Sequence, residues 1–319
     1  MNDNRIAWVD WAKALSIFFV VIGHVGNEIL RPFVYAFHVP AFFVISGYLY
    51  KKSWWFQTLL SFAVPVLCFS VLWFLLSLIL SNFNLGEAWY VNTWFVYKLD
   101  ATRPMFTGLW FLEVLFVGRL LLGDAGFDFI RDNYKFFSIF AVILSVSVDI
   151  FSVEMSWYVT RIIQCFPFLG LGLCLKETNL FNINPKGKKT VAIAIGGGIL
   201  FLVLIYVNQW CDIMYNRYNS TFIVFYINAI IGSLLLIYLC LFLRKSSVIE
   251  IFSTGTLVIL ATHTRIASVF KSILHKFVNC EPLDGVLLPI VSMIVSYYIV
   301  IICKRYCPYL LGKIKISRK

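Results

Sequence analysis

Charged side chains are scarce in this sequence of 319 residues. Aspartate, glutamate, lysine and arginine make up only 13% of it, against about 25% in soluble proteins, whereas 61% of the residues are hydrophobic. Such a composition excludes an ordinary soluble protein and predicts a polytopic membrane protein. The formal net charge of +11 is then expected in loops on one side of the membrane, not on a nucleic-acid-binding face.

Motifs of soluble catalytic modules are also missing. The sequence has no Gly-x-Ser-x-Gly elbow, Walker loop, His-Glu-x-x-His or Rossmann glycine pattern. Its eight cysteines include no Cys-x-x-Cys pair, and Cys303 and Cys307 have no histidine or acidic partner nearby. We therefore expect no metal, no bound cofactor and no structural disulfide. Residues 1–319 are expected to form a single transmembrane domain that carries any chemistry itself.

Long apolar runs are frequent. A transmembrane helix needs about 20 apolar residues, and ten runs approach this length, which predicts an all-α fold with about ten transmembrane helices. The runs are Trp11–Leu30, Phe33–Tyr50, Phe56–Leu80, Thr107–Leu122, Lys135–Phe151, Trp157–Leu175, Thr190–Trp210, Thr221–Leu243, Thr254–Leu274 and Val286–Lys304. The second and fourth runs are short, and Pro40 and Pro65 favour kinks, so broken or tilted helices are expected there.

Basic residues are distributed unevenly between the connecting segments. Ten spans place both termini on one side of the membrane. If that side is the cytoplasm, most of the lysine and arginine falls in cytoplasmic segments and little falls outside. The positive-inside rule therefore predicts cytoplasmic N- and C-termini. The expected location is the plasma membrane, which is the inner membrane in a bacterium.

The first apolar run carries three ionisable residues. Charged groups at membrane depth are costly, which makes them functional candidates. Asp10 and Lys13 are spaced i,i+3, and Lys13 and His24 are eleven residues apart. On a helix this spacing places all three on one face, with His24 about 16 Å beyond Lys13. A neutral imidazole suits general-base catalysis near pH 7. We take the three as catalytic candidates; for His24 the alternative is a packing hydrogen bond between helices.

Four further polar residues lie in apolar runs and are candidates for substrate binding. They are His38, Glu113, Arg161 and His263. His38 could bind the carbonyl that Pro40 leaves free, or it could line the site opposite His24. Arg161 could extend to the outer interface or bind an anionic group. The sequence leaves both pairs of alternatives open.

Lys51 and Lys52 follow the second run on the expected cytoplasmic side. Adjacent lysines at this place are explained by topology alone. The functional alternative is a contact with the phosphates of an anionic donor that arrives from the cytoplasm. Both lysines are therefore candidate donor-binding residues.

Two segments resemble the integral-membrane acyltransferase family 3, and within it the short fucose 4-O-acetylase-like proteins. Residues 10–14 (DWAKA) and His24 reproduce a family pattern of arginine or lysine, ten residues and histidine. Residues 37–48 (FHVPAFFVISGY) resemble a second family segment. Later landmarks, at residues 108–112 (GLWFL), 166–170 (FPFLG) and 255–263, follow in the family's order. The resemblance covers almost the whole chain.

The resemblance implies transfer of an acyl group, usually acetyl from cytoplasmic acetyl-CoA, to hydroxyls of sugars or glycans. His24 would be the essential histidine and Lys13 its basic partner. The expected partners are acetyl-CoA, a glycan or lipid-linked saccharide acceptor and membrane lipid. One feature departs from the family: many members carry an arginine cluster that helps to hold CoA, but residues 53–64 contain no basic residue.

A transporter or flippase for a glycan or small solute is the alternative function. The broken second run and the buried charges favour it, because transporters use interrupted helices at their binding sites. The lack of an inverted repeat in the sequence counts against it.

Overall fold

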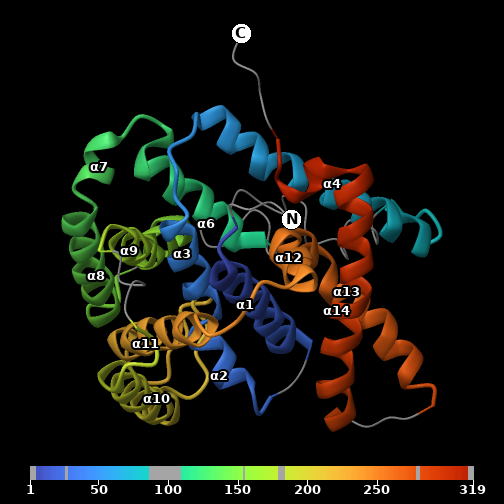
Figure 1. Ribbon diagram of the computed structural model, residues 1–319. Helices are drawn as coiled ribbons and strands as arrows, with labels where there is room; N and C mark the ends of the chain where they lie inside the picture. The colour runs from blue at the N-terminus through green and yellow to red at the C-terminus, as the bar shows by residue number, and fades with distance from the viewer. Residues whose placement is uncertain are drawn as a thin grey trace.

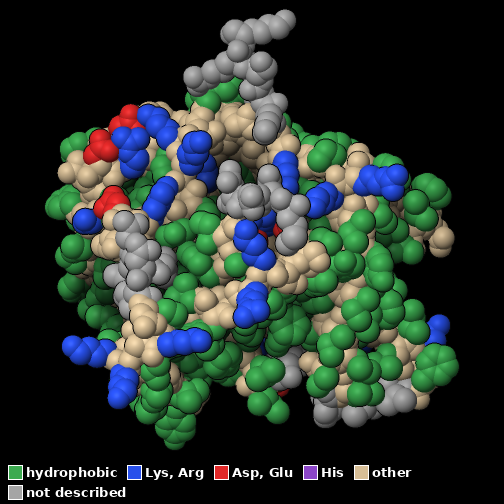
Figure 2. All heavy atoms as spheres, in the orientation of Figure 1, with side chains coloured by type: hydrophobic (Ala, Val, Ile, Leu, Met, Phe, Trp, Pro, Cys, Tyr) green, Lys and Arg blue, Asp and Glu red, His purple; other side chains and the backbone are tan. Residues whose placement is uncertain are grey.

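The computed structural model describes residues 5–25, 28–85, 109–153, 155–178, 184–277 and 281–314. Within these ranges the regular structure is helical, without a named β-strand, and the helices form one bundle (Figure 1). The expected all-α fold is thereby confirmed. Hydrophobic side chains cover the flanks of the bundle, and many lysine and arginine side chains lie in the upper part of the view in Figure 2.

Seven helices in the described part of the chain contain a segment long and apolar enough to cross a membrane. They are α1 (Ala7–Val25), α4 (Trp55–Leu80), α9 (Trp157–Glu177), α10 (Lys188–Asn208), α11 (Phe222–Cys240), α13 (Thr256–Leu274) and α14 (Glu281–Tyr306). On α10 the exposed side chains are mainly isoleucine, leucine and valine, which suits contact with lipid tails. These helices support the expected membrane protein.

The other three expected spans are shorter helices. The second run contains α2 (Arg31–Tyr35) and α3 (His38–Tyr48), the fourth contains α6 (Trp110–Arg119) with a π-helical continuation Leu120–Asp124, and the fifth contains α8 (Tyr134–Ile150). The expected number of about ten spans is therefore not confirmed. The second run is broken, as expected, but the break falls before Pro40. The proline lies in the first turn of α3, where a missing N–H costs no helical hydrogen bond.

Both ends of the described chain lie at the same end of the bundle, which we call the terminal end. Arg5 pairs with Glu250 of α12 (Ser247–Thr254), and Glu250 also pairs with Lys304 near the end of α14. After α14 a short 3₁₀ helix, η4 (Pro308–Leu311), packs against α4 and α13. The chain therefore begins and ends beside the same group of helices.

The tightest helix contact joins α3 and α9. A Cβ atom added to Gly47 would lie 2.1 Å from the carbonyl oxygen of Leu169, and one added to Gly172 would lie 2.0 Å from that of Val44. Only glycine allows two helix backbones to approach this closely. Helix α1 packs against α3 on one side and against α13 and α14 on the other, so it lies at the centre of the bundle.

Candidate active site

Three of the four histidines in the sequence meet in one cavity of about 400 Å³, which we call the histidine cavity. His24 comes from α1, His38 from α3 and His263 from α13. The ring centroids of His24 and His263 are 5.2 Å apart, and Tyr35 lies 6.2 Å from His24 and 5.0 Å from His38. The structure thus brings together three candidate residues that are distant in the sequence.

Each of these histidines has its Nδ1 atom against a carbonyl oxygen of its own helix. The distances are 2.8 Å from His24 to Val20, 2.6 Å from His38 to Val34, and 3.0 and 2.9 Å from His263 to Ile259 and Leu260. A carbonyl oxygen only accepts, so Nδ1 carries the hydrogen. In a neutral ring Nε2 then keeps its lone pair. In the neutral form, each ring therefore has its unprotonated nitrogen at Nε2.

The three rings differ in exposure. His24 is exposed in the cavity, whereas His38 and His263 are buried. The Nε2 atom of His263 has no hydrogen-bond partner in the described structure. His38 bonds the carbonyl oxygen of Val34 and not that of Ala36, the carbonyl that Pro40 leaves without its i−4 partner, and its ring lines the cavity. Among the described residues no three histidine, cysteine, aspartate or glutamate side chains could share a metal ion.

The turn between α10 and α11 closes one side of the histidine cavity. Asp212 and Arg217 bridge the turn through two backbone hydrogen bonds of 2.8 and 3.0 Å, and residues 212–215 line the cavity. Burial raises the pKa of Asp212, and the backbone N–H groups of Met214 and Tyr215 and the charge of Arg161 oppose this. The turn therefore contributes a carboxyl group whose proton is held more tightly than usual.

Arg161 holds this turn from α9. Its guanidinium donates to the carbonyl oxygen of Met214 at 3.2 Å, to Oδ1 of Asn216 at 3.3 Å and to the side chain of Gln164. Arg161 is 4% exposed and does not line the cavity. Because it is buried, lies outside the cavity lining and bonds the turn, its place in the fold is that of a residue that positions the cavity wall.

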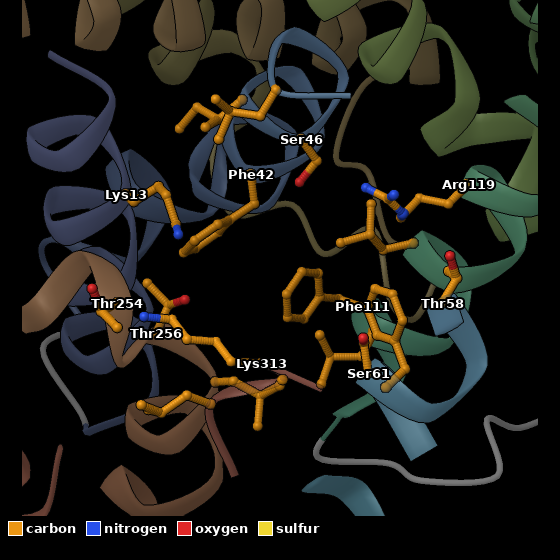
Figure 3. A pocket seen from close by; sticks show the side chains of 18 of the residues that line it. Lys13, Phe42, Ser46, Thr58, Ser61, Phe111, Arg119, Thr254, Thr256 and Lys313 are labelled. Atoms are coloured by element: carbon orange, nitrogen blue, oxygen red, sulfur yellow. The ribbon is translucent and has the colours of Figure 1, made fainter. Parts of the chain in front are cut away.

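A second cavity of about 670 Å³ lies at the terminal end, and we call it the basic cavity (Figure 3). Arg5, Lys13, Arg119 and Lys313 contribute four positive charges to its wall, and no aspartate or glutamate belongs to its described lining. Hydroxyl groups and aromatic rings complete the wall; they include Ser46, Thr58, Ser61, Thr254, Thr256, Phe42 and Phe111. Such a lining suits a ligand with several negative charges and an apolar part.

Arg119 is held at this cavity by a buried carboxylate. Asp124 lies 3.1 Å from the Arg119 guanidinium and its side chain is fully buried. It also accepts hydrogen bonds from Tyr50 Oη at 3.0 Å, from the Ser53 N–H at 2.8 Å and from Thr58 Oγ1 at 2.7 Å. The preceding glycine has φ +121°, which ends the π-helical turn at Asp124. One carboxylate therefore joins Arg119 to the wall of the cavity.

Helix α1 connects the two cavities. Lys13 lines the basic cavity and His24 lines the histidine cavity. They lie eleven residues apart on one continuous helix, which corresponds to about 16 Å. Asp10 lines neither of these cavities: it pairs with Arg5 and accepts a hydrogen bond of 2.6 Å from Ser253. Lys13 and His24 therefore face different ligand spaces, and Asp10 belongs to the packing of the terminal end.

Three other candidates lie outside both cavities. Lys52 pairs with Asp128 of the short helix α7 (Asp128–Asp132) at 2.7 Å, and the backbone carbonyl of Lys51 accepts from Arg119 at 3.3 Å. Glu113 accepts from Tyr158 Oη at 2.8 Å, between α6 and α9. Arg5, Arg119 and Lys313 line the basic cavity, although none of them is a donor-binding candidate from the sequence. Lys51 and Lys52, the two candidates for that role, do not line it.

A family model described as an acyltransferase domain matches residues 6–305, which include the lining of both cavities except Arg5 and residues 311–314 of the basic one. Comparison with curated proteins and with solved structures gave no match. The family match covers most of the chain and agrees with the resemblance carried by Lys13, His24 and residues 37–48. On this evidence the chain belongs to acyltransferase family 3, a family of membrane proteins that transfer acyl groups.

Proposed function

We propose that the protein is an O-acetyltransferase, which moves acetyl from cytoplasmic acetyl-CoA to a hydroxyl of a surface glycan or lipid-linked saccharide. The observation that carries the proposal is that α1 connects two cavities with different linings. Lys13 lies in a cavity with four positive charges, and His24 lies about 16 Å further in a cavity with three histidines. One cavity suits a polyanionic donor and the other suits proton transfer.

The donor fits the basic cavity. CoA carries a pyrophosphate and a 3′-phosphate, which would face the cations of Lys13, Arg119, Arg5 and Lys313. Its pantetheine arm is long and only weakly polar. Ile17 and Phe42 offer it an apolar path between α1 and α3. The thioester at the end of the arm would then be directed towards His24.

The acceptor fits the histidine cavity. Nε2 of His24 takes the proton of the acceptor hydroxyl, and the oxygen attacks the thioester carbonyl carbon. The C–S bond breaks, an ester forms, and the proton passes from His24 to the CoA sulfur. In the two-step alternative Nε2 first attacks the thioester and carries the acetyl group. Trp110, Tyr35 and Tyr215 supply aromatic surfaces on which a sugar ring can stack.

The proposed orientation places the terminal end in the cytoplasm. The short helices support about ten crossings, because α3 and α6 each contribute residues to both cavities. Helix α8 likewise links the two ends: Tyr134 bonds Glu177 at 2.7 Å at one end, and Asp149 accepts from the Phe222 N–H at 3.1 Å at the other. A donor from the cytoplasm would enter the basic cavity, and an acceptor would enter from the opposite side.

The test is hydrolysis of radiolabelled acetyl-CoA by the purified protein in detergent. Wild type is expected to release acetate slowly, because water can replace the acceptor. His24→Ala is expected to lose this activity and Lys13→Ala to bind CoA more weakly. His275→Ala, which removes the one histidine outside the cavity, is the control and should behave as wild type. Hydrolysis that persists in folded His24→Ala protein would contradict the proposal, and solute flux into liposomes without thioester turnover would favour a transporter.

A further inference from the structure

The segment that follows α14 lies beyond the family match, which ends at residue 305. We call residues 307–314 the C-terminal strap. The strap forms η4, packs against α4, α13 and α14, and returns to the basic cavity, which its residues 311–314 line. It is therefore a structural part of a cavity whose other lining residues, except Arg5, lie within the family match.

Two features fix the path of the strap. Leu311 is 8% exposed and belongs to the hydrophobic core that also contains Ile17 and Phe42. Gly312 follows with φ +69°, and a Cβ atom added there would lie 3.0 Å from the carbonyl oxygen of Ser61. The left-handed backbone and the close approach to α4 both favour glycine. The strap is thus anchored immediately before Lys313, so its position relative to the cavity is defined.

Lys313 adds its charge to cations that already repel one another. Lys13 and Arg5 both interact electrostatically with Lys313. Glu250 is the acidic group that acts on Lys313, but it already pairs with Arg5 and Lys304. Figure 3 shows the side chains of Lys313 and Lys13 at the wall of the same open space. Several like charges around one cavity favour an anion with more than one negative charge.

We propose that the C-terminal strap completes the donor site and that Lys313 binds a phosphate group of the donor. The inference rests on the proposed function for the identity of the donor as acetyl-CoA. It adds that residues 6–305 alone form an incomplete donor site. The strap would close over the phosphate end of the donor, on the side away from His24, and would leave the thioester free to approach the histidine cavity.

The experiment measures CoA binding by the purified full-length protein with calorimetry. Lys313→Gln is expected to weaken binding about 5- to 20-fold, as the loss of one charge-assisted hydrogen bond does at a partly exposed site. Lys313→Arg should keep most of the affinity. Arg305→Gln removes a nearby charge that lies over the Tyr306 ring and not in the cavity, so it should bind as wild type. Because Lys313 is exposed, Lys313→Gln should also keep the melting temperature of the wild type.

A second substrate separates a phosphate contact from a structural effect. S-acetyl-pantetheine carries the thioester but no phosphate, so Lys313→Gln should hydrolyse it as fast as the wild type does. Equal losses with acetyl-CoA and S-acetyl-pantetheine would overturn the proposal. It would also be overturned by unchanged CoA affinity in Lys313→Gln, the result expected if the lysine held a lipid headgroup. A wild-type protein that bound no CoA would overturn the proposed function itself.

Discussion

The imidazole rings of His24 and His263 meet edge to face, with centroids 5.2 Å apart and ring planes inclined by 80°. Each ring has its Nδ1 hydrogen directed at a carbonyl of its own helix. Two bases from helices α1 and α13 thus face one cavity in the same tautomer. The exposed ring, His24, is the one available to a substrate, and the buried ring, His263, packs against it.

His24→Gln is expected to lower the rate of acetyl transfer or thioester hydrolysis by about 10²- to 10⁴-fold, the range for loss of a general base. Glutamine keeps an amide that can satisfy the Val20 carbonyl, so the fold should persist. CoA affinity should not change, because the phosphates would bind at the other end of α1. The control is His275→Gln, since His275 pairs with Asp284 away from the cavity. A His24→Gln protein with the wild-type rate would exclude His24 as the base.

His263→Gln is expected to reduce kcat by about 10-fold, the effect of losing one hydrogen bond or contact that orients a neighbouring group. The reason is that His263 packs against His24 and presents an unbonded Nε2 to the same cavity. The Kd for CoA should stay at the wild-type value. If kcat and the affinity for CoA fall in proportion, the substitution has disturbed the packing of α13 and not only the histidine pair.

Asp124→Asn is expected to weaken both stability and donor binding. The carboxylate accepts from Tyr50, Ser53 and Thr58 and pairs with Arg119, so the amide leaves at least one buried group poorly satisfied. The loss of unfolding free energy should be about 1–3 kcal/mol. Thermal unfolding and CoA titration measure the two effects. As a control, Asp128→Asn removes the exposed ion pair with Lys52 and should change neither property.

Arg161→Met is expected to loosen the turn at residues 212–217. The methionine fills part of the space but removes the hydrogen bonds that Arg161 donates to Met214 and Asn216, at a cost of about 1 kcal/mol for each bond lost. The melting temperature and the transfer rate should fall, while CoA affinity stays unchanged because the basic cavity lies elsewhere. Weakened CoA binding in this variant would show that Arg161 supports more than the turn.

CoA affinity is expected to fall at high pH earlier in wild type than in Lys313→Arg. Partial loss of hydration and the charges of Arg5 and Lys304 hold the pKa of Lys313, an exposed side chain, below its usual 10.5, whereas Glu250 acts in the opposite direction; Lys13 faces the same space. The charged amine binds phosphate, so affinity is complete below this pKa and declines as the pH rises through it. Arginine stays charged throughout. The prediction would be contradicted if the CoA affinities of wild type and Lys313→Arg changed in parallel between about pH 7 and 10.

The regular rise of a helix explains which part of the site could be predicted from sequence. Lys13 and His24 belong to one continuous helix, so their separation and common helix face follow from their spacing. His38 and His263 were recognised because histidine is rare in apolar runs. That they converge with His24 depends on how α3 and α13 pack against α1, and one sequence does not contain this information.

The lining of the basic cavity depends on contacts that the sequence does not reveal. Adjacent lysines after an apolar run, such as Lys51 and Lys52, point to a donor contact, but Lys52 pairs with Asp128. Lys313 looked like one of several charges in a basic tail. Its entry into the cavity depends on the burial of Leu311 and on the left-handed turn at Gly312. Apolar length alone also does not decide the number of spans, because α2, α3 and α6 are shorter than the seven long apolar helices.

The glycine contact between α3 and α9 restricts how the bundle can move. Sliding one helix along another requires clearance, and Gly47 and Gly172 leave none against the backbone that faces them. The two helices therefore behave as one rigid body that carries His38 and, through Arg161, the turn at Asp212.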